Sequence, residues 1–318
     1  VFYVGFDNGG VWRSTDYGSN WTPIFDREST GSIGAIAVAQ SDPKVIYVGT
    51  GAAIIRPDFS TGNGVYKSVD AGKTWTHLGL KDSQMIAQID VDPRDPNRLF
   101  VAALGHPYGP NAERGVFRST DGGKSFQKVL YKDEYTSAND VRIDPANPDT
   151  VYAALWVQQQ SYIEGGAFGS TGGGIFKSTD GGTTWKQVTA GLPDVIQANL
   201  GISQSYSKIL YATIAGTAAP AAAAAGAGGP PAAAAAQGGR GGGRGGGGGG
   251  GGGVGLYKSV DGGDHWFLAV KGPSGTGTRT PDSRPLGRIG GGDLPPVIVD
   301  PKNPDVLYSC STVLWRSE

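Results

Sequence analysis

Short runs of apolar and β-branched residues alternate with turn-forming residues along most of the chain. One such unit starts with residues 86–91, continues after an Asp-Pro turn with residues 98–103, and adds residues 115–119 and 125–131. Runs of this kind, bounded by Gly, Pro, Asn and Asp, are typical of strands joined by tight turns. The pattern therefore predicts units of four antiparallel strands, which we call strands A, B, C and D.

A turn motif of the form Ser-x-Asp-x-Gly-x-x-aromatic recurs between strands C and D with a period of about 50 residues, the length of one four-stranded propeller blade. The sequence thus predicts an all-β fold, a β-propeller of four-stranded antiparallel blades. The motif residues are Ser14, Asp16, Gly18, Trp21, Ser68, Asp70, Gly72, Trp75, Ser119, Asp121, Gly123, Phe126, Ser178, Asp180, Gly182, Trp185, Ser259, Asp261, Gly263 and Trp266.

The motif has a structural explanation. The Ser hydroxyl and the Asp carboxylate can accept hydrogen bonds from turn amides that would otherwise stay unpaired, and the glycine permits a positive φ. The aromatic residue packs between neighbouring blades. Because five copies on one repeat cannot all serve one active site, we expect these residues to be structural and assign no catalytic residue.

This spacing divides the whole chain, residues 1–318, into blades of one propeller. We expect a partial blade at 1–25, blades at 32–80, 84–131, 137–189 and 198–270, and a partial blade at 292–318. The first partial blade holds strands B, C and D, and the last holds A, B and C. Since these do not add up to one blade, we expect an incomplete part of a longer propeller protein.

A Gly/Ala-rich low-complexity tract, residues 216–253, interrupts one blade between strands B and C. Such a composition buries too little apolar surface to offset the entropy of ordering, so we expect the tract to be disordered. The alternative is a packed segment stabilised by neighbours, which would indicate contacts with another chain.

Composition excludes several classes of function. With 27 Lys and Arg against 28 Asp and Glu, the net charge is −1, which argues against nucleic-acid binding through a basic surface. One cysteine excludes an internal disulfide framework and a cysteine-based zinc site, and the three histidines are scattered. We therefore expect no metal and no cofactor. No apolar run is long enough for a transmembrane segment.

The repeated motif is the Asp-box, or BNR repeat. Together with residues 64–82 and 103–111, it makes the chain similar to large bacterial Asp-box proteins that are labelled glycosyl hydrolase or sortilin-like (VPS10) repeat proteins. The resemblance covers the chain except residues 216–253. It implies a β-propeller in a bacterial secreted, periplasmic or cell-surface protein.

Neighbouring Asp-box families bear on an enzymatic function. Sialidases carry an Arg-Ile-Pro motif, and Arg288-Ile289-Gly290 is the nearest match here. Xyloglucanases are two-propeller enzymes with an acidic residue in an Asp-x-Gly-Gly turn, which Asp7-Asn8-Gly9-Gly10 resembles, although an ordinary hairpin turn favours the same residues. Photosystem assembly factors show the same scaffold used for protein binding.

Long insertions fall on one face of the predicted propeller, the face of the B–C and D–A connections, which we call the loop face. Function tends to reside on variable loops over a rigid scaffold, so we place a ligand-binding surface there. Aromatic, amide and charged side chains suit a carbohydrate or polypeptide ligand. The alternative for Trp156 and Tyr162 is that they cover the core of their own loop. The candidate residues are Arg56, Asp58, His106, Tyr108, Glu113, Arg114, Trp156 and Tyr162.

The sequence analysis leads to three functional hypotheses. The first is a non-catalytic propeller outside the cytoplasm that binds or scaffolds a protein or polysaccharide, with further domains or subunits as additional partners. The second is a glycoside hydrolase of the xyloglucanase type, which needs two carboxylates facing each other on the loop face, with Asp7, Asp58, Glu113 and Glu164 as candidates. The third is a structural subunit of a cell-surface assembly. We take the first as the leading hypothesis and expect no hydrolysis of xyloglucan.

Overall fold

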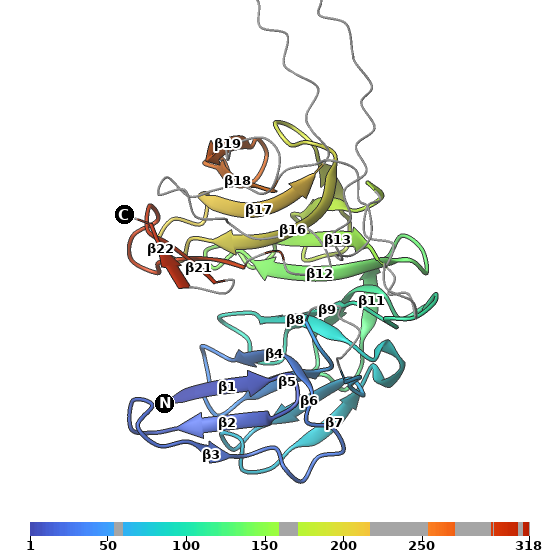
Figure 1. Cartoon of the computed structure of the whole chain (residues 1–318), viewed down its shortest axis with the longest axis vertical. Helices are drawn as coiled ribbons and strands as arrows, with labels where there is room; N and C mark the ends of the chain where they lie inside the picture. Colours follow the sequence, from blue (N-terminus) through green and yellow to red (C-terminus); the bar gives the residue numbers. More distant parts are fainter. Residues whose placement is uncertain are drawn as a thin grey trace, which may run out of the picture.

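Six antiparallel sheets follow one another along the chain. The computed structural model describes residues 1–53, 60–158, 171–216, 254–270, 294, 296–310 and 314–317, and the sheets lie within these residues. In Figure 1 they form an arc, with the two chain termini on the same side of the molecule. The predicted all-β propeller fold of four-stranded antiparallel blades is confirmed.

Each sheet is built from strands in chain order, so that every connection is a hairpin. The first, three-stranded sheet contains β1 (Phe2–Phe6), β2 (Gly10–Ser14) and β3 (Thr22–Pro23). The second contains β4 (Ile33–Val38), β5 (Ile46–Thr50), β6 (Val65–Ser68) and β7 (Thr76–Gly79). The third contains β8 (Ile86–Val91), β9 (Leu99–Ala103), β10 (Gly115–Ser119) and β11 (Gln127–Leu130).

The remaining sheets repeat the arrangement. The fourth contains β12 (Thr136–Ile143), β13 (Val151–Val157), β14 (Gly174–Ser178) and β15 (Lys186–Val188). The fifth contains β16 (Val195–Ile202), β17 (Leu210–Gly216), β18 (Val254–Ser259) and β19 (Phe267–Val270). The sixth contains β20 (Val297–Val299), β21 (Leu307–Cys310) and β22 (Leu314–Arg316). A short 3₁₀ helix, η1 (Lys81–Ser83), lies between β7 and β8.

The core lies between neighbouring sheets. The largest clusters combine residues of adjacent sheets, as where Tyr47 of β5 packs with Ile89 of β8 and Val101 of β9. The strands β8, β12 and β16 contact one another in succession and are almost wholly buried. Buried apolar area is the main source of stability in such a stack, because each sheet has no core of its own.

The Asp-box turns share one hydrogen-bond arrangement. In all five, the Ser Oγ lies 2.8 Å from an Asp oxygen. In the third turn Ser119 Oγ also accepts from the amide of Gly123 at 2.8 Å, and the Asp121 carboxylate accepts from the amide and hydroxyl of Ser125 at 3.0 and 2.6 Å. These bonds favour the ionised carboxylate, so the pKa of Asp121 lies well below its usual value.

The glycine of this turn allows the sheets to approach one another. Gly123 has a φ of 87°, and a Cβ at this position would lie 2.3 Å from Leu78 Cδ1 in the preceding sheet. A side chain would therefore both strain the backbone and push the sheets apart.

Basic side chains of the second to fifth sheets each contact a turn of the following sheet. Lys67 Nζ donates to the Gly122 carbonyl at 3.2 Å, and Arg118 Nη1 donates to the Gly181 carbonyl at 2.6 Å. Further along the chain, Lys177 pairs with Asp264 at 2.7 Å and Lys258 pairs with Asp305 at 2.9 Å. We call these four contacts the inter-sheet ties.

Candidate functional site

Strand order places several predicted candidates on one face. In a hairpin-connected sheet successive connections alternate between the two ends of the strands. The β1–β2 and β9–β10 connections therefore lie on the same face as the β7–β8 connection, and this is the loop face defined above. The face carries Asp7, Asp82 and the residues of the loop 104–114.

Asp7 stands in the exposed turn between β1 and β2. The two strands pair as far as Phe6 and Gly10, and Gly10 closes the turn with a φ of 68°. Trp12 Nε1 donates to the Gly9 carbonyl at 2.7 Å and holds the turn. Asp7 Oδ1 accepts a hydrogen bond from Ser32 Oγ at 3.0 Å, and the single proton of this hydroxyl is shared with the Ser60 carbonyl at 2.8 Å. Within the described residues Oδ2 has no hydrogen-bond donor, so this carboxylate is both oriented and accessible.

A second group of polar side chains surrounds Asp82. Asp82 Oδ1 lies 3.1 Å from His106 Nε2, and Asp82 Oδ2 accepts from Asn111 Nδ2 at 3.0 Å. The Asp82 side chain is 67% exposed, and η1, which carries it, is flanked by Leu80 and Gln84, both with a left-handed backbone. The turn after β7 is thus held in a strained conformation that presents the carboxylate to the loop 104–114.

Arg114 holds the loop 104–114 in place through hydrogen bonds. Its guanidinium is buried and donates to the carbonyls of His106 and Gly109 at 2.7 and 3.0 Å, to the carbonyls of Tyr135 and Gln158, and to Ser137 Oγ. Burial lowers the pKa of Arg114 to about 10. The loop position of Arg114 predicted an accessible side chain. The structure instead uses the Nη1 and Nη2 groups for internal hydrogen bonds, because five acceptors converge on a buried site.

The other predicted candidates differ in their surroundings. Trp156 lies in β13 and is 2% exposed; it packs with Met85 and Leu104, which adjoin the third sheet, so it belongs to a core between sheets and not to the core of its own loop. Tyr108 and Glu113 are half-buried in the same loop as His106. Arg56, Asp58, Tyr162 and Glu164 lie outside the described residues. Ligand binding by His106, Tyr108 and Glu113 stays a prediction.

Among the described residues, no three His, Cys, Asp or Glu side chains are grouped so that they could hold a metal ion. In the same part of the chain, no helix is long and apolar enough to cross a bilayer.

Sequence analysis missed a charged cluster inside the stack of sheets. Asp90 of β8 accepts a hydrogen bond from the amide of Ile143 in β12 at 2.7 Å, and Asp140 of β12 accepts from the amide of Leu200 in β16 at 2.7 Å. Arg142 Nε lies 2.9 Å from Asp140 Oδ1. Burial raises the pKa of Asp90 to about 6. The signal was an ionisable residue within an otherwise apolar strand, such as Asp90 between Ile89 and Val91.

Comparisons with known proteins identify related sequences. The sequence profile of the Sortilin-Vps10 family (sortilin, neurotensin receptor 3) matches residues 9–138 and, in a second match, residues 63–196. The two matches together extend over more than half of the 318 residues.

Curated relatives carry enzyme names. A xyloglucanase of Acetivibrio thermocellus is 26% identical over 255 residues, which are 69% of this chain and 27% of that protein. An oligoxyloglucan-reducing end-specific xyloglucanase of Emericella nidulans is 32% identical over 108 residues, covering 32% of this chain and 13% of that protein. The chain therefore spans about a quarter of the length of the first of these relatives.

Solved structures agree on the fold. The crystal structure of an ancestral GH74 enzyme superposes with a TM-score of 0.59 at 19% sequence identity, covering 99% of this chain and 36% of that one. The relatives contradict the leading hypothesis of a non-catalytic scaffold, because the curated proteins similar to this chain are named as xyloglucanases. That hypothesis was based on the structural role of the Asp-box turns. These turns lie on the other face of the sheets, so their structural role does not prevent the loop face from carrying catalytic groups.

Proposed function

The chain belongs to the Sortilin-Vps10 family, and we propose that it is a propeller module of a glycoside hydrolase that cleaves xyloglucan. The observation that carries the proposal is the similarity to xyloglucanases over 69% of the chain. Since the chain spans only part of such relatives, the activity is proposed for the full-length protein. A polysaccharide substrate implies that the enzyme works outside the cytoplasm.

Asp7 is the carboxylate that we propose for the reaction. The Asp7-Asn8-Gly9-Gly10 turn resembles the turn that holds an acidic residue in xyloglucanases. Its local chemistry supports a catalytic role, because Ser32 orients one oxygen while the other is left for a proton or for the sugar. Glycoside hydrolysis uses two carboxylates, and in this role Asp7 acts as base or nucleophile.

The second carboxylate has to face Asp7 across the bound sugar. A separation of about 5–5.5 Å gives retention of configuration at the anomeric carbon, and about 6.5–9.5 Å gives inversion. Of the other candidates that the sequence suggested, Glu113 is on the described part of the loop face, and its Oε2 is shielded from solvent without a hydrogen-bond partner in the described residues. Glu113 is therefore the next carboxylate to test, and Glu113→Gln is the variant to measure after Asp7→Asn.

The test is release of reducing ends from xyloglucan by the full-length protein. We expect turnover in the parent protein and a loss of about 10²–10⁴-fold in Asp7→Asn, because the amide can neither accept the proton nor attack the sugar. Asp42→Asn is the matched control: Asp42 lies on the opposite face and, like Asp7, accepts one hydrogen bond, from the Lys44 amide at 3.1 Å. Absence of turnover in the parent protein refutes the proposed function, and full turnover in Asp7→Asn refutes the role of Asp7.

A further inference from the structure

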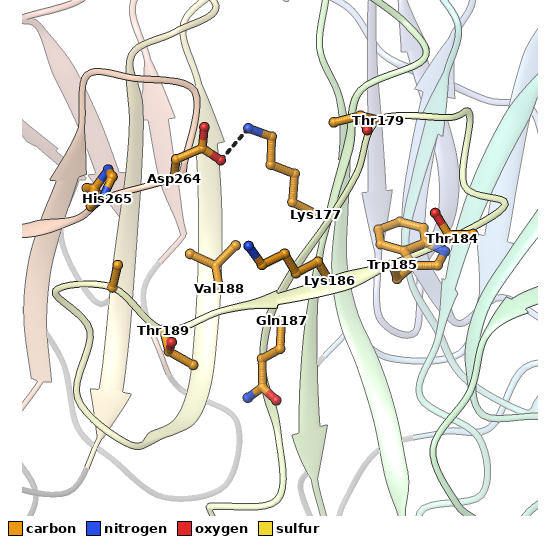
Figure 2. Close-up of a pocket in the computed structure, with 11 residues that line it drawn as sticks. Lys177, Thr179, Thr184, Trp185, Lys186, Gln187, Val188, Thr189, Asp264 and His265 are labelled. Atoms are coloured by element: carbon orange, nitrogen blue, oxygen red, sulfur yellow. Dashed lines mark hydrogen bonds and ion pairs between the residues drawn. The ribbon is translucent and has the colours of Figure 1, made fainter.

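An open groove lies between the fourth and fifth sheets, and its lining extends from the Asp-box end of β15 to Thr189 and Ala190 in the β15–β16 connection. It has a volume of about 640 Å³ and runs along β15 to the Asp-box turn that precedes β19. Figure 2 shows Lys186 and Gln187 in the middle, Asp264 and His265 on one side, and Trp185 on the other. Asp7 belongs to the first sheet and is not among the residues that line the groove, so the groove is separate from the proposed catalytic carboxylate.

The charges along the groove are largely balanced. Lys177 neutralises Asp264 at 2.7 Å, and His265 Nδ1 lies 2.7 Å from Asp261. Lys186 is exposed and makes no hydrogen bond or ion pair with another described residue. The groove therefore lacks the cluster of unpaired charges that binding of a highly charged ligand requires.

The remaining lining combines an aromatic ring with polar groups. Trp185 is half-buried, and its indole nitrogen donates to the Gly182 carbonyl at 3.1 Å, which fixes the ring. Lys186 and Gln187 are exposed, and the Gln187 amide nitrogen donates to the Gly173 carbonyl at 3.4 Å. A fixed ring next to exposed polar side chains suits a ligand with apolar faces and many hydroxyl groups.

Among the described strands, the combination of Trp185, Lys186 and Gln187 occurs at the fourth sheet. Lys186 pairs with Lys177 in the fourth sheet. The residue equivalent to Lys186 is Gln127, opposite Arg118, in the third sheet. In the second sheet it is Thr76, opposite Lys67. At the equivalent position the fifth sheet has Phe267. The groove is therefore a local feature of the fourth sheet, and the repeat pattern by itself does not require it.

We propose that this groove binds a segment of a neutral polysaccharide chain as a second site, distinct from the catalytic one. The identity of the ligand as xyloglucan rests on the proposed function. A long polymer that occupies the groove and the loop face together gains apparent affinity through multivalency, whereas a short oligosaccharide does not.

Retention of the full-length protein in native gels that contain xyloglucan tests this site. The measurement uses the Asp7→Asn background, so that the polymer stays intact. We expect Trp185→Ala, and separately the double variant Lys186→Ala/Gln187→Ala, to weaken retention about tenfold, the effect of losing about 1.4 kcal/mol of binding free energy. The double variant keeps the test valid if Trp185→Ala fails to fold, because Lys186 and Gln187 are exposed.

Gln127→Ala on β11 is the control, since it removes the same side chain from the outer strand of the neighbouring sheet. In the parent background, turnover of short oligosaccharides should be unchanged by the groove variants. Unchanged retention in both groove variants, or equal loss in Gln127→Ala, overturns the proposal. Equal or stronger retention in gels that contain an anionic polysaccharide in place of xyloglucan overturns the neutral ligand in favour of an anionic one. Failure of the proposed function is recognised separately, by absence of turnover in the parent protein.

Discussion

At the residue scale, the serine of each Asp box contributes as much to the turn as the aspartate. Ser119 is 2% exposed, and its hydroxyl both donates to Asp121 and accepts from the buried amide of Gly123. Asp121, in contrast, also bonds to Ser125 at the exposed end of the turn. A buried amide that loses its partner costs more free energy than an exposed one, because water cannot replace the lost hydrogen bond.

Ser119→Ala should therefore lower the free energy of unfolding by about 1–3 kcal/mol, the cost of a buried donor without a partner. Chemical denaturation followed by tryptophan fluorescence measures the change. Ser125→Ala, at the exposed end of the same turn, is the control and should have a smaller effect. Equal effects of the two changes would show that the buried amide is not the important group.

Single residues also mark the limit of sequence analysis. The Asp-box residues could be recognised because their hydrogen bonds join positions two to four apart in the chain. Arg114 and Trp156 could not be placed correctly from their loop positions, because their burial depends on distant residues. Gln158, for example, is 44 positions from Arg114.

At the scale of the elements, inner strands of neighbouring sheets are linked by buried carboxylates. Asp90 joins β8 to β12, and Asp140 joins β12 to β16, with Arg142 beside both carboxylates. Burial disfavours the ionised form of Asp90, and its pKa of about 6 lies above the usual 3.8. The native state therefore holds a proton that the unfolded chain releases, and the contribution of Asp90 to stability falls as the pH rises from 4 to 6.

Asp90→Asn should remove this pH dependence. The amide oxygen can still accept from Ile143, but the side chain no longer titrates. We expect the parent protein to be more stable relative to the variant at pH 4 than at pH 7, as measured by denaturant unfolding at both values. The same substitution at Asp42, in a turn far from Arg142, serves as control. A difference that is constant between pH 4 and pH 7 would contradict the burial of an ionisable Asp90.

Strand order and turn positions were predictable because each hairpin is built from local signals, such as the Asp-Pro turn before β9. The link from Asp90 to Ile143 was not, since it joins residues of different sheets. The groove beside β15 was missed for the same reason, because His265 and Lys186 meet only when the fourth and fifth sheets pack together.

At the scale of the whole molecule, the low-complexity tract predicted at residues 216–253 connects two strands of the fifth sheet that pair directly with each other. Strands β17 and β18 pair in register from Leu210 opposite Ser259 to Ala215 opposite Val254. Residues 217–253 lie outside the described part of the chain, so the expected disorder stays a prediction. The pairing of the strands places the two ends of the connection side by side.

Replacing residues 217–253 with an Asn-Gly turn should therefore leave the fold intact. The strand ends already meet at Ala215 and Val254, and loop length changes the closure entropy only slowly. Thermal unfolding followed by circular dichroism should show one cooperative transition at an unchanged or slightly raised midpoint. A replacement by a flexible Gly/Ser segment of the original length controls for composition. Loss of the cooperative transition in both would show that the natural tract packs against the propeller.

The inter-sheet ties give the two ends of the arc different sensitivities to ionic strength. Lys67 and Arg118 end on backbone carbonyls, so the first two ties are charge–dipole contacts. Lys177 and Lys258 end on carboxylates that are 60% and 74% exposed, which makes the last two ties screened ion pairs. Added salt therefore weakens the ties between the fifth sheet and its neighbours at a lower concentration than the ties between the third sheet and its neighbours. Since the polysaccharide groove lies at one of these salt-sensitive junctions, its width is linked to the ionic composition of the surrounding medium.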